Sequence, residues 1–150
     1  MNDRLEQAVA LLKEKQVSCV IWIDGKEPIL SDEIGIKPLM KVLRKERHAF
    51  EHGVIADKVV GKAAALMAIL GGAKAVYGQV LSESAEKILQ IYGIEYAYEE
   101  KVPYIENRTK TGQCPLEESV ISVDDPEKAF EVLEETIAEL MRKNFQRPAK

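Results

Sequence analysis

The spacing of apolar residues changes repeatedly along this chain. A period of about 3.6 residues, typical of a helix that faces a core, alternates with a period of two or a short apolar run, both typical of strands. The predicted order is helix, hairpin, helix, helix, strand, helix, strand, helix. Strands joined through helices lie parallel, and a hairpin adds antiparallel neighbours. The sequence therefore predicts an α/β sandwich with a mixed central sheet flanked by helices.

Turn and cap residues set the expected element boundaries. The Asp24-Gly25 pair between two apolar runs predicts a hairpin with strands at 17–23 and 27–31. Pro38 is expected to begin a basic helix that Gly53 ends, and Gly71-Gly72 to end a helix over 58–70. The remaining elements are a first helix at 3–15, strands in "KAVYGQVL" and "EYAYEEKV", a serine-capped helix in "SESAEKILQIYGI", and a last helix at 126–144.

Composition limits the class of protein. A chain of 150 residues with 46% hydrophobic content fits a single domain over 1–150, with a frayed tail at about 145–150. The net charge of -4 arises from 21 basic and 25 acidic residues spread along the chain, so neither nucleic acid nor a membrane surface is an expected partner. Charges near the start and the lack of a long apolar run predict a soluble cytoplasmic protein. Cys19 and Cys114 are expected to be free thiols.

Three stretches carry a family resemblance: "ADKVVGKAAA" at 56–65, "VYGQVLSESA" at 76–85 and "VPYIENRTKTGQCPLEE" at 102–118. Together with the element order, they resemble a family of small, functionally uncharacterised microbial proteins with a cytidine deaminase-like fold. The resemblance extends over nearly the full length. It implies a mixed sheet flanked by helices and no established activity.

The zinc motifs of catalytic deaminases are missing from the matching positions. Those enzymes need a His or Cys with a nearby Glu at one helix start, and Pro-Cys-x-x-Cys at the next, to hold zinc and a proton-shuttling carboxylate. Here these positions read "VVGKAAA" and "LSESAEK", and Ser82 and Ser84 cannot supply the thiolates of such a site. The sequence therefore predicts no zinc-dependent deamination and no metal or other cofactor.

A first candidate binding segment lies at Asp57, Lys58, Gly61 and Lys62. It is not a P-loop, because Ala56 replaces the leading glycine and Ala63 the magnesium-binding hydroxyl. Asp57 could cap the predicted helix, with free N–H groups of its first turn and a lysine available to a phosphate. The alternative is purely structural, since Gly61 and the alanines after it also let a helix lie close to a sheet.

A second candidate segment comprises Asn107, Arg108, Cys114 and Glu117, in a polar loop that ends at a predicted helix start. Arg108 beside Asn107 suits recognition of an anionic group, or could form a surface ion pair. Cys114 could occupy the cap position of that helix with Glu117 three residues on, which allows a nucleophilic role, although "CPLEE" also fits a capped helix start.

The stretch "HAFEH" at 48–52 matches the H-x-x-E-H pattern in which two histidines one helical turn apart bind zinc. Gly53 follows at once and no third ligand is evident. The alternative is a pair of exposed histidines at the end of a basic helix.

The sequence therefore leads to a hypothesis of metal-independent binding of a small phosphorylated or nucleotide-type ligand, between Asp57–Lys62 and Asn107–Glu117. One alternative is an enzyme that performs transfer or hydrolysis on a nucleotide-like substrate, with Asp57 or Cys114 as nucleophile. Another is a regulatory or scaffolding subunit, in which apolar faces of the first and last helices support a homo-oligomer.

Overall fold

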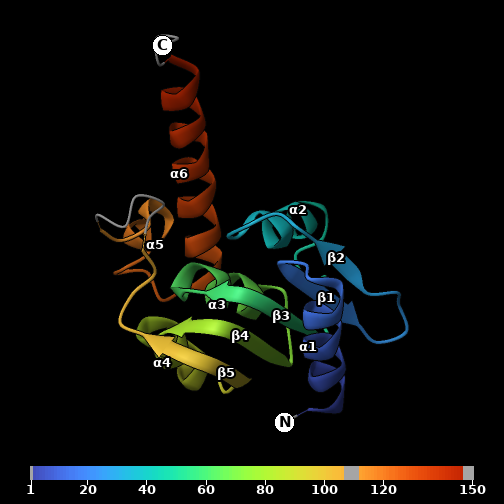
Figure 1. Ribbon diagram of the computed structural model, residues 1–150. Coiled ribbons are helices and arrows are strands. Elements are labelled where there is room, and N and C mark those ends of the chain that lie inside the picture. Colours follow the sequence, from blue (N-terminus) through green and yellow to red (C-terminus); the bar gives the residue numbers. More distant parts are fainter. Residues whose placement is uncertain (1, 107–111, 147–150) are drawn as a thin grey trace.

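The computed structural model describes residues 2–106 and 112–146 and folds them into a mixed five-stranded sheet with helices on both faces (Figure 1). The strands are β1 (Cys19–Ile23), β2 (Ile29–Ser31), β3 (Gly53–Val60), β4 (Ala75–Ser82) and β5 (Glu95–Val102). The helices are α1 (Asp3–Lys15), α2 (Lys37–Lys45), α3 (Lys62–Leu70), α4 (Glu83–Ile91), α5 (Pro115–Ser119) and α6 (Pro126–Gln146). The predicted α/β class and mixed sheet are confirmed.

The strand order is β2-β1-β3-β4-β5. β1 runs antiparallel to β2 and to β3, so that Cys19 lies opposite Ser31 on one side and Asp57 on the other. β3, β4 and β5 are parallel neighbours, and α3 and α4 form the connections between them. The hairpin exists as predicted, but its strands are shorter, at 19–23 and 29–31. The carboxyl ends of three parallel strands therefore meet at one edge of the sheet.

α1 covers one face of the sheet and is the helix of the described chain that joins the core cluster there. Asn2 caps this helix, because its Oδ1 accepts the N–H of Leu5 at 3.1 Å. The buried side of the helix carries Leu5, Ala8 and Leu12, which form one cluster with sheet residues Val20, Val54, Ala56, Ala75 and Tyr77. This is the amphipathic packing that the apolar spacing of residues 3–15 predicts.

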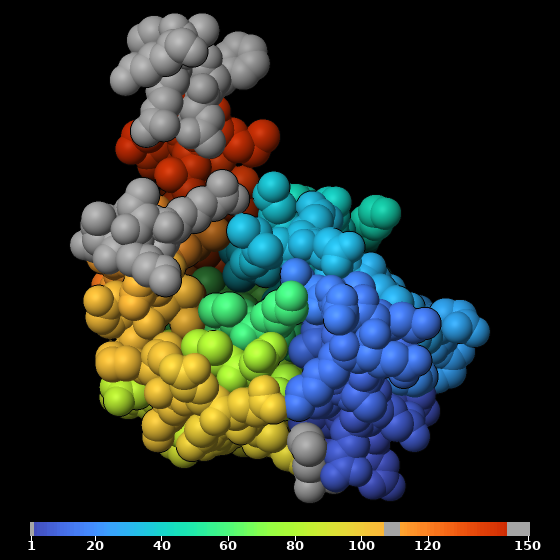
Figure 2. Space-filling model, viewed as in Figure 1, coloured from blue at the N-terminus to red at the C-terminus, as the bar shows by residue number. Residues whose placement is uncertain are grey.

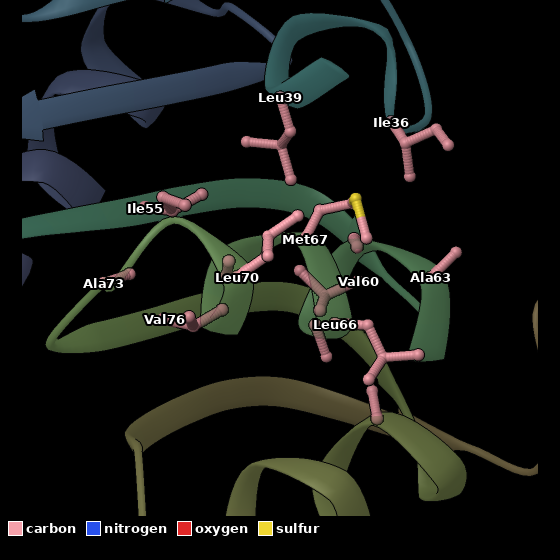
Figure 3. Packing of buried hydrophobic residues seen from close by; sticks show 14 of the residues in the cluster. Ile36, Leu39, Ile55, Val60, Ala63, Leu66, Met67, Leu70, Ala73 and Val76 are labelled. Carbon is pink, nitrogen blue, oxygen red and sulfur yellow. The ribbon is translucent and has the colours of Figure 1, made fainter. Parts of the chain in front are cut away.

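The opposite face carries the larger core, centred on α3. Almost every residue of α3 is buried, because α3 lies between the sheet and the surrounding helices. Figure 3 shows Leu66, Met67 and Leu70 of α3 among side chains of the sheet and of the α2 region. The alanines at 63, 64, 65 and 68 keep the helix narrow enough for this position.

The predicted start of the central helix is wrong. Residues 58–60 belong to strand β3, and the helix begins only at Lys62, with Gly61 in extended conformation as its N-cap. Val59 and Val60 pair with β4, and the Lys58 N–H donates to the Ser18 carbonyl, so long-range hydrogen bonds outweigh the local helical pattern. Asp57 is therefore a strand residue and cannot cap the helix.

The prediction that the second helix runs to Gly53 is also wrong. α2 ends at Lys45, and residues 47–52 form turns in which Phe50 is fully buried against Gly71. His52 has a left-handed φ of +61°. The two histidines of "HAFEH" therefore do not lie one turn apart on a helix, which removes the geometry that the zinc pattern requires.

The last helix is α6, which packs on the body over about its first three turns, as far as Ile137, and then projects from it, as the red part of the chain shows in Figure 2. Ala129, Phe130 and Leu133 are the residues of this helix that enter the core. α6 extends to Gln146 instead of the predicted 144, and the rest of the predicted frayed tail, 147–150, lies outside the described residues. Among the described residues, no helix combines the length and hydrophobicity needed to span a membrane.

Candidate functional site

Two helices begin at the carboxyl ends of neighbouring parallel strands. α3 follows β3 after Gly61, and α4 follows β4 directly, with Ser82 as its N-cap. The Ser82 Oγ accepts the N–H of Ala85 at 3.1 Å, which confirms the predicted serine cap. Crevices at such strand ends are the usual place for ligands in open α/β sheets. The residues around the two helix starts are therefore the natural candidates for a site.

The start of α3 is already occupied by a carboxylate of the chain. Glu117, on α5, accepts hydrogen bonds from the N–H groups of Lys62 at 2.7 Å and Ala63 at 2.8 Å. It is only 5% exposed, and burial raises its pKa, although both N–H groups and the charge of Lys62 act in the opposite direction. A Cβ at Gly61 would come within 2.7 Å of Glu117 Oε2, so glycine is needed for this close approach. The prediction of free first-turn N–H groups at this helix is therefore wrong.

Lys62 is directed to the segment between α5 and α6. Its Nζ donates to the carbonyl of Ile121 at 2.9 Å and to Asp124 Oδ1 at 2.6 Å. The Lys62 side chain is 9% exposed, whereas that of Asp124 is 71% exposed, so a largely buried cation meets a solvated anion. An ammonium group has three N–H donors, and these two bonds leave one for a further acceptor.

Glu117 and Cys114 share a small cavity with Gly61. The cavity has a volume of about 50 Å³, and its lining, which also includes Ile36, Val59 and Ile105, is almost entirely apolar. We call it the cysteine cavity. Residues 61–64 and 114–117 therefore meet, as the two-segment hypothesis requires. None of the described lining residues is a lysine or arginine, so the cavity lacks the positive charge that a phosphate needs.

Asp57 lies away from this cavity lining, inside the sheet. It is 4% exposed, and burial raises its pKa to about 7. Its Oδ1 accepts the N–H of Val59 at 3.4 Å, while Oδ2 is buried without a hydrogen-bond partner in the described structure. Burial is also the main cause that raises the pKa of the neighbouring Cys19 thiol, and Asp57 adds to it. Asp57 is therefore a buried carboxyl group of β3 that lies opposite the buried Cys19 in the neighbouring strand β1.

A larger pocket lies on the other side of Lys62, between the starts of α3 and α4 and the segment before α6. Its volume is about 250 Å³, and it is lined by Lys62, Ser84, Lys87, Ile88, Ile91, Ile121 and Asp124. We call it the lysine pocket. It combines two cationic side chains and a hydroxyl with three isoleucines.

Two hydrogen-bonded groups shape the lysine pocket. Ser84 Oγ lies 3.1 Å from Ser82 Oγ, and because Ser82 already accepts the Ala85 N–H, its own hydrogen can be donated to Ser84. The Ser84 hydroxyl hydrogen is then available to a ligand. Lys62 lowers the pKa of Asp124, with a smaller contribution from Lys87, so Asp124 is a carboxylate at neutral pH.

The chain also matches the model of a known protein family. The family described as "TM1506: Domain of unknown function (DUF1893)" matches residues 7–137, which is most of the chain. The chain belongs to the DUF1893 family.

A solved structure supports the assignment. The DUF1893 chain is similar to the crystal structure of TM1506, a DUF1893 family protein from Thermotoga maritima, with a TM-score of 0.80 and 28% sequence identity over 90% of each chain. No curated protein gave a match. The comparisons thus establish membership of a family whose function is unknown.

The site residues predicted for this DUF1893 protein fall into four groups. Gly61, Cys114 and Glu117 meet at the cysteine cavity, and Lys62 lines the lysine pocket. Asp57 is buried in β3, and Lys58 is an exposed residue of the same strand. The predicted Asn107 and Arg108 lie outside the described residues, so their roles stay predictions.

Sequence reasoning missed Ser84, Lys87, Ile121 and Asp124 as lining residues. Lys87 lies one turn after Ser84 on α4, and that spacing was the one local signal for a polar face beside the helix start. Ile121 and Asp124 had no such signal, because their position depends on hydrogen bonds to Lys62, about sixty residues away in the chain. In the described part of the chain, no group of three or more His, Cys, Asp or Glu residues could hold a metal ion.

Proposed function

We propose that this DUF1893 protein binds a small phosphorylated molecule in the lysine pocket. The observation that carries the proposal is the convergence of Lys62, Lys87 and the Ser84 hydroxyl on one pocket of about 250 Å³. Ammonium and hydroxyl donors are the side-chain groups that bind phosphate oxygens most strongly after arginine. The volume lies just below the range of about 300–1,000 Å³ usual for drug-sized ligands, which favours a small molecule.

The charges of the pocket favour an anion by a narrow margin. Two lysines face one carboxylate, Asp124, which leaves a single net positive charge among the lining residues. The Asp124 side chain is largely exposed and can move aside while Lys62 keeps its bond to the Ile121 carbonyl. A phosphate is then expected to replace Asp124 as the partner of Lys62, with Lys87 and Ser84 as further donors.

This proposal moves the ligand from the place that the sequence suggested. The cysteine cavity is small and apolar, and the start of α3 is bonded to Glu117. Of the residues predicted to bind the ligand, Lys62 keeps a direct role in the proposal.

We also propose that the sheet and its helices form a cytidine deaminase-like arrangement. Its support is the start of α3 and α4 at the ends of adjacent parallel strands, the two places where such enzymes carry their zinc ligands. Here Lys62 begins the first helix, and Ser82 and Ser84 lie at the start of the second. The proposed pocket thus lies between the same two helix starts, and binding there is expected to be independent of metal.

The test is a titration of the full-length protein with inorganic phosphate, followed by amide chemical shifts. The expected shifts are centred on residues 62, 84, 87 and 121–124. Lys87→Ala is expected to weaken binding by about 0.2–1 kcal/mol, or about 1.4- to 5-fold, because Lys87 is exposed. Asp124→Asn is expected to strengthen binding, since it removes the competing carboxylate.

The matched control is Lys26→Ala, which removes the same charge from the exposed turn between β1 and β2. Equal effects of the two lysine substitutions on the affinity for phosphate would show that binding depends only on the net charge of the protein. The proposal would then be wrong. Weaker binding by Asp124→Asn would contradict the assigned competition.

The enzymatic alternative requires a nucleophile that substrate can reach. Asp57 is almost fully buried, and Cys114 lies beside a cavity with little space. A regulatory or scaffolding role remains the third hypothesis, and light scattering on the intact protein would reveal the predicted homo-oligomer.

A further inference from the structure

Three isoleucines line the lysine pocket, and two of them are strongly exposed. We call Ile88, Ile91 and Ile121 the aliphatic wall. Ile88 is buried, but Ile91 is 62% exposed and Ile121 is 60% exposed. Among the exposed large hydrophobic residues of the described chain, only Met141 exceeds them. A single exposed isoleucine needs no explanation, but two that line the same polar pocket do.

The backbone that carries this wall is fixed from two sides. Lys62 Nζ binds the carbonyl of Ile121, and the Tyr92 hydroxyl donates to the carbonyl of Asp124 at 3.0 Å. Tyr92 directly follows Ile91 at the end of α4. Its hydrogen bond connects the end of α4, which carries Ile91, to the segment that carries Ile121. These two hydrogen bonds therefore hold the 121–124 backbone beside α4, which places Ile121 next to Ile91 in the pocket.

Phosphate binding alone leaves this surface exposed to water. A phosphate that carries a polyol would place hydroxyl groups against the isoleucines, where they would lose water without gaining hydrogen bonds. A phosphate that carries an apolar group covers the wall and releases water from it. The pocket therefore complements a ligand with both a charged and an apolar end.

We propose that the ligand is a phosphomonoester whose organic part presents an apolar face, such as an aromatic ring, to the aliphatic wall. The phosphate lies at Lys62, Ser84 and Lys87, as in the proposed function on which this inference rests. The organic part lies on Ile91 and Ile121, and its size is limited by the 250 Å³ of the pocket. Hydrophobic contact with the wall, instead of hydrogen bonding, distinguishes the ligand from other phosphate esters.

The experiment compares three probes on the full-length protein: inorganic phosphate, glycerol 1-phosphate and phenyl phosphate. We expect phenyl phosphate to bind about tenfold more tightly than glycerol 1-phosphate in calorimetric titrations, since both esters carry the same phosphate group. Ile91→Gln keeps a side chain of similar length on α4 and is expected to abolish the preference for phenyl phosphate over glycerol 1-phosphate. The matched control is Ile34→Gln, which alters another strongly exposed isoleucine outside the pocket.

The outcomes separate this inference from the proposed function. If inorganic phosphate binds with the expected dependence on Lys87 but the two esters bind equally, the inference is wrong and the phosphate site stands. A preference for phenyl phosphate that survives both Ile91→Gln and Ile121→Gln also overturns the inference. If none of the three probes binds, the proposed function and the inference both fail.

Discussion

The contact between Glu117 and the start of α3 gives the most direct test of the structure. Both oxygens of this buried carboxylate accept backbone N–H groups, from Lys62 and Ala63, at 2.7 and 2.8 Å. Glu117→Ala leaves both donors without a partner at a site that little water can enter. Each unsatisfied buried N–H costs about 1–3 kcal/mol, so for two such groups we expect a loss of about 2–6 kcal/mol in the free energy of unfolding.

The assay is urea denaturation at constant pH, followed by circular dichroism. Glu117→Gln is expected to cost less than Glu117→Ala, because the amide oxygen still accepts one N–H while the amide nitrogen faces the other. Glu118→Ala is the matched control, since Glu118 is the exposed neighbour on the same helix. Its expected effect is within about 0.5 kcal/mol.

A double-mutant cycle with Gly61 tests whether residues 61 and 117 interact directly. Gly61→Ala places a methyl group against the Glu117 carboxylate, so the single substitution is expected to destabilise the fold. In the Glu117→Ala background that space is free, and the cost of Gly61→Ala should be smaller. Additive effects within about 0.5 kcal/mol, or a cost of Glu117→Ala no larger than that of Glu118→Ala, would refute this account of the contact.

Three further predictions concern the core. Burial raises the pKa of Asp57 from 3.8 to about 7, so the native state binds this proton more tightly than the unfolded chain, and stability falls as pH rises from about 4 to about 7. Asp57→Asn should remove up to about 4 kcal/mol of that loss. Denaturation should therefore show a gain at pH 8 that exceeds the gain at pH 5 by about 2–3 kcal/mol, and gains of equal size at both values would contradict the assignment. Cys114 should react with a thiol reagent in the native protein while Cys19, buried in the sheet, reacts only on unfolding, and mass spectrometry of the labelled peptides would detect the reverse order. Phe50→Ala should lower the free energy of unfolding by about 3–5 kcal/mol, because its ring is fully buried against Gly71, and a loss below about 1 kcal/mol would show that the turn is not anchored there.

Local chemistry in the sequence was sufficient for much of the fold. Ser82 caps α4, the glycine pair at 71–72 ends α3, and Pro126 begins α6, because each depends on the backbone preference of a few adjacent residues. The alternation of periods also gave the mixed sheet, since parallel strands require helical crossovers. The family resemblance in the stretches 56–65, 76–85 and 102–118 is confirmed by membership of the DUF1893 family, whose domain is described as one of unknown function.

Local chemistry failed where a residue's conformation depends on distant partners. The sequence predicts no strand over 53–60 and a helix from 58, yet β3 extends through these residues because Val59 and Val60 pair with Val80 and Leu81 of β4. The predicted site failed for a similar reason. The sequence predicts that Asp57 caps the helix and that N–H groups of its first turn are free for a ligand, whereas the N–H groups of Lys62 and Ala63 donate to Glu117, a carboxylate from another helix.

The sequence by itself determined which segments are helices and strands in most of the chain, and that two polar segments flank the strand ends. The tertiary structure decided how the charges are used. Glu117, 55 residues from Lys62, satisfies the start of α3, and Asp124, 62 residues away, turns the Lys62 side chain toward the lysine pocket. Because these contacts join residues with no local relation, no spacing rule could have predicted them, and they separate an apolar cavity at Cys114 from a cationic pocket beside α4.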